Sequence, residues 1–136
     1  MVKPKGSLTS SQFEILDLLW EHETGMSVAE IWDVLQKKRK VTRTTVLNLV
    51  DRLEKRNWLS RKKIDGIFQY QPAVERESTE HMLADEFIGD FFDGSPANFL
   101  LSLLGTRRIS KSEVGRLKKL LDESSDTGKN KKKRGR

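Results

Sequence analysis

The stretch Val41–Trp58, VTRTTVLNLVDRLEKRNW, decides the fold of this chain because it predicts a helix with two unlike faces. Apolar side chains recur at the i, i+3, i+4 and i+7 spacing of a buried helix stripe, at Val46, Leu49, Val50 and Leu53. Short hydrogen-bonding groups and cations lie off that stripe, mostly near its start: Thr42, Arg43, Thr44, Thr45, Asn48 and Arg52. Thr42 is a suitable N-cap for this helix.

Two interpretations fit such a helix. Thr, Asn and Arg side chains near the start of a helix whose other side is buried are typical of a recognition helix in the major groove of DNA. An ordinary surface helix would show the same pattern, so the neighbouring segments have to decide between them.

The residues upstream predict two further helices behind a loose basic leader, residues 1–7. Thr9 and Gln12 have the spacing of a capping box, and the helix they open should run to about Trp20. Ser27 and Glu30 form a second capping box, whose helix ends in the charged run 37–40. Each helix has one apolar face, made by Phe13, Leu16, Leu19 and Trp20 in the first and by Val28, Ile31, Trp32 and Leu35 in the second.

The residues downstream predict a β-hairpin with a basic arm. Residues 58–63 and 67–71 alternate as short strands, and the Asp65-Gly66 pair between them suits a tight hairpin turn. Pro72 ends the second strand. Three helices followed by a basic hairpin, in this order, predict a winged helix-turn-helix over residues 1–74. The predicted fold class is therefore mostly α with a small β-hairpin wing.

The remaining chain predicts a helical dimerisation region at residues 75–124 and a disordered basic tail at residues 125–136. Helices are expected over residues 75–92 and 96–104 and from about Ser110, with Ser95 as N-cap and Pro96 as first residue of the middle helix. Their apolar side chains exceed what three short helices can bury on one another: Phe87, Phe91, Leu100, Leu103, Leu104, Leu117, Leu120 and Leu121. A homodimer would cover this surface, and packing back onto the winged helix is the alternative. The tail would add non-specific phosphate affinity or have no measurable role.

The composition fits a DNA-binding protein and offers little for catalysis. The 136 residues carry a net charge of +6, distributed as +4 over residues 1–74, −4 over residues 75–128 and +6 over residues 129–136. A polyanion is therefore expected on the first part of the chain. There is no cysteine, no membrane-spanning apolar run and no signal-peptide core, so we expect a cytoplasmic protein without membrane insertion. The two histidines, His22 and His81, lie in different regions without a nucleophile or metal spacing, so we expect no enzyme, metal or cofactor.

If the protein binds double-stranded DNA, the side chains divide into two roles, because base contacts specify sequence and phosphate contacts supply affinity. We predict base contacts from Arg43, Thr44, Thr45, Leu47 and Asn48, with Leu47 suited to a thymine methyl group. We predict phosphate contacts from Ser27, Thr42, Arg52, Arg61, Lys62 and Lys63. The alternative function is a winged helix that assembles with proteins and has no specific affinity for DNA.

With these elements in place, the chain resembles the BlaI/MecI family of bacterial repressors from Leu8 to about Leu121. The matching segments are Leu8–Thr9, Phe13–Trp20, Ser27–Ile31, Thr44–Val46, Leu49, Arg52–Leu53, Lys55, Ile67–Tyr70 and Gly94 with the leucine-rich helix after it. The resemblance implies a dimeric winged-helix repressor on a palindromic operator. Some relatives carry a basic residue at the position of Thr44 and Arg at that of Leu47, so no operator sequence is implied.

The resemblance also concerns how repression is relieved. In the best-known members, a membrane sensor-protease responds to a β-lactam and the repressor is then cut at an Asn-Phe bond in its leucine-rich helix. The family register places Ser102-Leu103 at that bond in this chain, whereas Asn98-Phe99 lies about one turn earlier. We therefore expect this helix to be needed for dimerisation, and we do not expect its cleavage to be the event that relieves repression. Copper-responsive relatives carry C-terminal cysteines, which this chain lacks.

Overall fold

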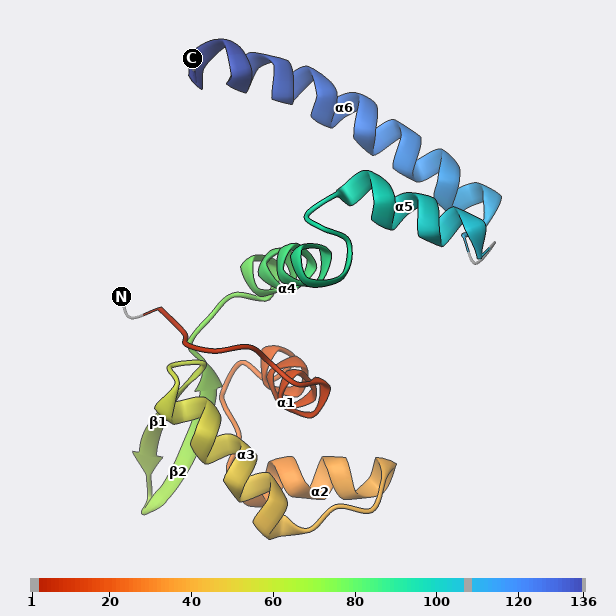
Figure 1. The fold of residues 1–136 in the computed structure, drawn as a ribbon. Helices are drawn as coiled ribbons and strands as arrows, with labels where there is room; N and C mark the ends of the chain where they lie inside the picture. The colour runs from red at the N-terminus through yellow and green to blue at the C-terminus, as the bar shows by residue number, and fades with distance from the viewer. Residues whose placement is uncertain (1–2, 107–108, 136) are drawn as a thin grey trace. The chain divides into compact units, whose positions relative to one another are not determined.

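The computed structural model describes the backbone of residues 3–106 and 109–135, and side chains within these ranges up to Ser124 (Figure 1). It confirms the predicted class, mostly α with a two-stranded antiparallel wing. The elements are α1 (Ser10–Trp20), α2 (Val28–Lys38), α3 (Arg43–Lys55), β1 (Leu59–Ile64), β2 (Ile67–Pro72), α4 (Arg76–Phe91), α5 (Pro96–Gly105) and α6 (Lys111–Gly135).

The helix starts follow the predicted caps. In α1, the Thr9 hydroxyl accepts from the Gln12 N–H at 3.2 Å, and the Gln12 side chain accepts from the Thr9 N–H at 3.0 Å. Ser27 and Glu30 make the same reciprocal pair at the start of α2. Each box satisfies backbone donors that the first turn of a helix leaves free, which is why these local patterns mark the boundaries well.

The end of α3 differs from the sequence prediction, which continued the helix to Trp58. The helix ends at Lys55 because Asn57 adopts a left-handed conformation with φ 69°. The Trp58 N–H donates to the Leu53 carbonyl at 2.9 Å and the Asn57 N–H donates to the Glu54 carbonyl at 3.1 Å. These bonds form a Schellman motif, and Trp58 then turns into the core with only 1% of its surface exposed.

The core of the winged helix lies between the first three helices and the hairpin. The largest fully buried side chains come from the three helices and from Trp58, which directly precedes the hairpin: Ile15, Leu16, Leu19, Ile31, Leu35, Val46, Val50, Leu53 and Trp58. The connection between α1 and α2 also pairs with the wing, because Met26 and Tyr70 exchange backbone hydrogen bonds of 3.0 and 2.8 Å. Gly25 permits this approach, since it has φ +83° and a Cβ there would lie 3.0 Å from the Tyr70 carbonyl oxygen.

The leader is tied to the end of α3 instead of being loose as predicted. The Lys5 N–H donates to the Arg56 carbonyl at 2.9 Å, and the Trp58 indole N–H donates to the Lys5 carbonyl at 3.0 Å. The Arg56 guanidinium donates to the Ser7 carbonyl at 3.0 Å. Trp58 and Arg56 therefore supply partners for the backbone of residues 5–7.

The chain divides into two compact units, residues 1–83 and 84–136. The first unit thus extends beyond residue 74, the boundary predicted from the sequence. Val74 and Met82 are partly buried against its core, and Thr79 is 3% exposed with its hydroxyl donating to the Glu75 carbonyl at 2.7 Å. The first half of α4 consequently belongs to the winged-helix unit.

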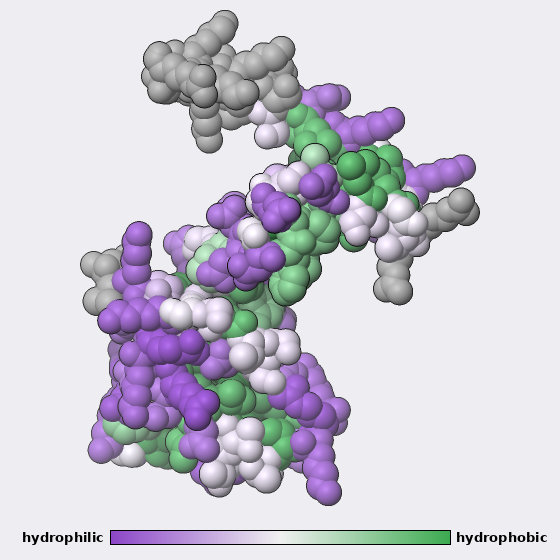
Figure 2. Space-filling view, in the orientation of Figure 1, coloured by the Kyte–Doolittle hydropathy of each residue, from purple (hydrophilic) through white to green (hydrophobic). Residues whose placement is uncertain are grey.

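The second unit has a small aromatic cluster and much exposed apolar surface (Figure 2). The rings of Phe87, Phe91, Phe92 and Phe99 contact one another with centroids 5.0–6.0 Å apart. No residue of α5 is buried, whereas Ser95 caps this helix and Pro96 begins it, as predicted. Apolar side chains of the unit remain exposed at Phe87, Phe91, Leu101, Leu104, Leu120 and Leu121.

The backbone of α6 is helical to Gly135, where the sequence predicts a disordered tail from residue 125. A helix that has already nucleated extends at little cost per residue, and Lys and Arg are good helix formers, which favours this continuation. In the ranges that the structure describes, no helix has the length and apolar character needed to cross a membrane.

Candidate nucleic-acid interface

The two faces of α3 are separated as the sequence predicts. Val46, Val50 and Leu53 are fully buried, with 0% of their surface exposed, and they fix the helix on the core. The five predicted base-reading side chains are all exposed on the other side: Arg43, Thr44, Thr45, Leu47 and Asn48. Leu47 is 48% exposed, so the exposed face of α3 also presents an apolar side chain.

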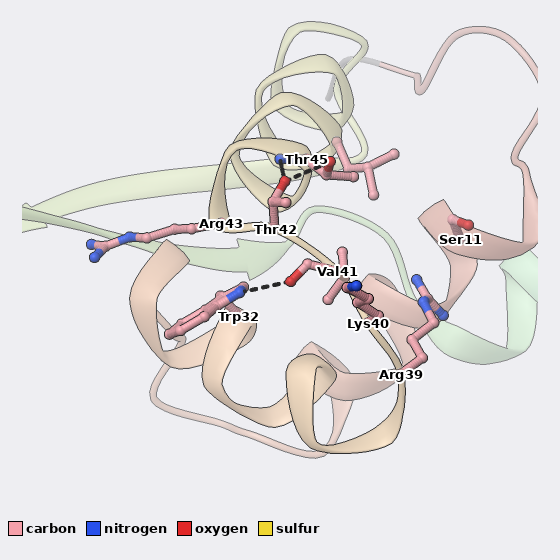
Figure 3. Close-up of a pocket in the computed structure, with 9 residues that line it drawn as sticks. Ser11, Trp32, Arg39, Lys40, Val41, Thr42, Arg43 and Thr45 are labelled. Carbon is pink, nitrogen blue, oxygen red and sulfur yellow. Dashed lines mark hydrogen bonds between the residues drawn. The ribbon is translucent and has the colours of Figure 1, made fainter.

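A hydrogen-bond network at the start of α3 orients two of the threonines. The Thr42 hydroxyl accepts from the Thr45 N–H at 3.1 Å, so Thr42 is the N-cap as predicted. The two hydroxyl oxygens lie 2.9 Å apart, and Figure 3 shows both interactions. When Thr42 donates to Thr45, the Thr45 proton is left to donate outward to a base or phosphate acceptor.

The turn between α2 and α3 is fixed by Trp32. Its indole N–H donates to the Val41 carbonyl at 3.0 Å, directly before the cap of α3 (Figure 3). Arg39, just after α2, makes an ion pair with Glu14 of α1. A surface pocket beside this turn is lined by Ser11, Trp32, Arg39, Lys40, Val41, Thr42, Arg43, Thr45 and Leu49. Lys40 is an exposed cation next to the predicted base-reading residues to which the sequence analysis gave no role.

The strand register divides the three wing cations between two faces. Lys63 pairs with Phe68 and Arg61 pairs with Tyr70, so these four side chains lie on one face of the hairpin. Tyr70, on this same face, is buried in the core. Lys62 pairs with Gln69 and points to the opposite face. The Arg61 guanidinium lies 4.2 Å and the Lys63 ammonium 5.5 Å from the Phe68 ring centroid, so one aromatic ring supports both charges.

The remaining predicted phosphate contacts lie in different surroundings. Arg52 is exposed and lines a shallow pocket with Thr9 at the start of α1 and with Lys55 and Arg56. Ser27 is only 8% exposed, and its hydroxyl accepts from the Glu30 N–H at 3.2 Å. Its observed role is to cap α2.

The described residues offer no catalytic constellation. His22 is exposed and its Nδ1 lies 2.9 Å from the Leu18 carbonyl oxygen, while His81 is exposed on α4 near Glu77. In the described part of the chain, no three His, Cys, Asp or Glu side chains are grouped as metal ligands. The first unit presents a surface of hydrogen-bond donors and cations, which is suited to binding an anionic partner.

Comparison with known proteins identifies the family. The sequence profile of the penicillinase repressor family matches residues 8–123. The chain is similar to the methicillin resistance regulatory protein MecI of Mammaliicoccus sciuri, at 25% identity over 85% of this chain and 94% of that protein. It is also similar to the penicillinase repressor of Bacillus licheniformis, at 23% identity over 93% and 94% of the two chains.

Solved structures with similar folds include the monomeric form of Bacillus licheniformis BlaI in complex with the blaP half-operator. That structure has a TM-score of 0.47 and 21% identity, over 53% of this chain and 87% of that chain. Wild-type apo MarR from E. coli has a TM-score of 0.49 and 18% identity, over 86% and 77%. Because the family profile covers most of its length, this chain belongs to the penicillinase repressor family, the BlaI/MecI family of DNA-binding transcriptional repressors.

Proposed function

We propose that this protein represses transcription as a homodimer on a palindromic DNA operator, with one winged-helix unit on each half-site. The observation that carries the proposal is the two-faced α3. Val46, Val50 and Leu53 of its apolar stripe are fully buried and Leu49 is partly buried, while Arg43, Thr45 and Asn48 are exposed at its N-terminal half. A helix held in this way can enter a major groove with its donors directed at base edges.

The base-reading and phosphate-binding roles follow from the side-chain chemistry. Arg pairs with guanine and Asn with adenine through two hydrogen bonds each, which suits Arg43 and Asn48. Leu47 suits a thymine methyl, and Thr44 and Thr45 suit either base edges or phosphates. The wing cations, Arg52 and the Thr42 cap would hold the phosphate backbone on either side of the groove.

The second unit supports the dimeric part of the proposal. Phe91 is 71%, Leu101 64% and Leu121 55% exposed, and these side chains lie on three different helices of the unit. Burying apolar surface contributes about 25 cal/mol per Å², so an identical unit presenting the same face would gain by covering it. A two-fold symmetric dimer would in turn match an operator with inverted half-sites.

The test is a selection of binding sites from random double-stranded DNA with the full chain. We expect an inverted repeat to be enriched, and a complex of two chains on one duplex by analytical ultracentrifugation. Binding should weaken as salt rises, because phosphate contacts release counterions. Enrichment of no sequence, together with affinity that does not depend on salt, would instead favour a winged helix that assembles with proteins.

Cleavage by a membrane sensor-protease is not part of this proposal. Such a partner is a property of the best-known family members. The residues at the family's scissile register, Ser102 and Leu103, differ from the Asn-Phe pair that those relatives carry.

A further inference from the structure

The start of α4 is held on the end of α1 by a group of interactions that we call the junction clamp, formed by Asp17, Trp20, Val74 and Arg76. The Trp20 indole N–H donates to the Val74 carbonyl at 3.0 Å. The Arg76 guanidinium donates to the Asp17 carboxylate at 2.6 Å and to the Asp17 backbone carbonyl at 3.4 Å. The same guanidinium lies 4.9 Å from the Trp20 ring centroid.

The clamp fixes both the position and the direction of the helix start. Val74 lies in the connection between β2 and α4, and Arg76 is the first residue of α4, so the chain is held on both sides of Glu75. The next turns continue the attachment, since Thr79 is buried and Met82 packs against the core of the same unit. Trp20 is itself held at an edge-on contact with Phe13, with ring centroids 5.7 Å apart.

Stability alone does not account for this arrangement. The Asp17 and Arg76 side chains are 45% and 39% exposed, and exposed ion pairs contribute little to folding. A guanidinium that meets a carboxylate, a carbonyl and an aromatic face at once is, however, restricted to one orientation. The clamp is therefore better suited to fixing the direction in which α4 starts than to stabilising the fold.

We propose that the junction clamp sets the distance between half-sites that the repressor accepts, with Asp17, Trp20 and Arg76 as positioning residues. This inference rests on the proposed function, because it requires a dimer on two half-sites. The α4 helix begins in the winged-helix unit and ends in the unit with the apolar surface. Because α4 leads from one unit into the other, the direction in which it starts limits where the reading helices of a dimer can reach, and a fixed start permits fewer half-site separations.

Loosening the clamp should change spacing selectivity before it changes anything else. The contacts of one winged helix with one half-site do not involve the clamp, so affinity for a single half-site should stay the same. The gain in affinity from a second half-site depends on the effective concentration of the second winged helix at its groove. This concentration is highest when the attachment of the winged helix matches the geometry of the two half-sites. A flexible attachment lowers this advantage at the best spacing and spreads it over others.

The experiment uses the full chain and duplexes that carry two inverted copies of its selected half-site, separated by the spacing found in the selected repeat or by one to four additional base pairs. Affinities are measured by fluorescence anisotropy at fixed salt. We expect the wild type to lose on the order of tenfold or more in affinity when two base pairs are added. The variants Arg76→Ala and Trp20→Phe should lose less than about threefold in affinity when the same two base pairs are added. Their affinity for a duplex with a single half-site should equal that of the wild type.

Two controls separate the clamp from charge and from folding. Asp17→Ala removes the same ion pair with the opposite change in net charge, so it should broaden the spacing preference as Arg76→Ala does. Lys37→Ala removes a cation whose ion pair with Asp33 stays within α2, and it should keep the wild-type preference. Circular dichroism melting of each variant checks that the fold is retained.

The outcomes distinguish this inference from the proposed function. If the wild type gains nothing from a second half-site, the dimeric repressor itself is refuted, and the clamp proposal with it. If the wild type is selective and all clamp variants keep the same spacing profile, the proposed function stands and the clamp inference is overturned. A wild type that binds every spacing equally well overturns the clamp inference directly.

Discussion

Thr45 and Asn48 are the residues at which sequence discrimination is most directly tested. Both are exposed on α3 one turn apart, and neither side chain supports the buried stripe. We expect Thr45→Ala or Asn48→Ala to lose on the order of 1–3 kcal/mol of preference for operator over unrelated DNA. Competition binding with the two DNAs measures this difference. An unchanged preference in both variants would remove these residues from base reading.

The wing cations should affect all DNA alike. Arg61→Ala should weaken binding to every sequence and lower the slope of log affinity against log salt by about one unit, since one phosphate contact is lost. We predict a smaller change for Lys62→Ala, because the register places Lys62 on the opposite face from Arg61, Lys63 and Phe68. Salt titrations of the two variants side by side provide the measurement. Equal changes in slope would show that both faces of the wing approach DNA.

Both of these roles were predicted from residue types, and the structure then shows on which face of the helix or hairpin each residue lies. The exposed positions on α3 follow from helical periodicity, which is a local property of the sequence. The opposite faces of Arg61 and Lys62 also follow from strand alternation, a signal that the sequence contains and that our assignment of all three cations to one role did not use. The burial of Ser27 could not be read from the sequence, because it results from packing around the start of α2.

At the scale of elements, one side-chain hydrogen bond joins α2 to the segment directly before α3. Trp32→Phe keeps an aromatic ring but removes the donor to the Val41 carbonyl, which precedes the cap of α3. We expect a loss of about 0.5–1.5 kcal/mol in unfolding free energy and a larger relative loss of operator discrimination than of non-specific affinity. Urea denaturation and competition binding check the two parts. Discrimination equal to that of the wild type would show that α3 does not need this bond for its position.

The α5 helix is the element in which cleavage would matter. Asn98 is exposed in its first turn, where its N–H donates to the Ser95 hydroxyl at 3.1 Å, and Phe99 is partly buried in the aromatic cluster. Ser102 is exposed and Leu103 partly buried one turn later. We predict that mass spectrometry of the repressor from cells exposed to a β-lactam shows only the intact chain. A fragment ending at Asn98 or Ser102 as target genes switch on would contradict this.

At the scale of the whole molecule, the division after Leu83 defines which truncation should fold. A chain ending at Leu83 keeps Val74, Thr79 and Met82 on the core, and we expect it to be a folded monomer by light scattering, in contrast to the dimer that we propose for the full chain. A chain ending at Ala73 loses the Trp20 hydrogen bond and two partly buried apolar side chains, which should cost on the order of 2 kcal/mol. Urea denaturation compares the two. A monomeric full-length chain at micromolar concentration would contradict the dimer.

The sequence by itself determined the order and type of the elements and the exposed face of α3. Capping boxes, helical periodicity, strand alternation and the Asp-Gly turn act between residues a few positions apart, so their outcome is written in short stretches of the chain. The winged helix could therefore be predicted together with the residues exposed on α3.

The tertiary structure alone decided how the connecting segments are held. Trp20 and Val74 are 54 residues apart and Asp17 and Arg76 are 59 apart, while the Trp58 indole reaches back over 53 residues to the leader. No local pattern encodes such pairs, because a donor finds a distant carbonyl only after the core has brought the two segments together. For this reason the end of the first unit, the attachment of the leader and the junction clamp became visible only in the folded chain.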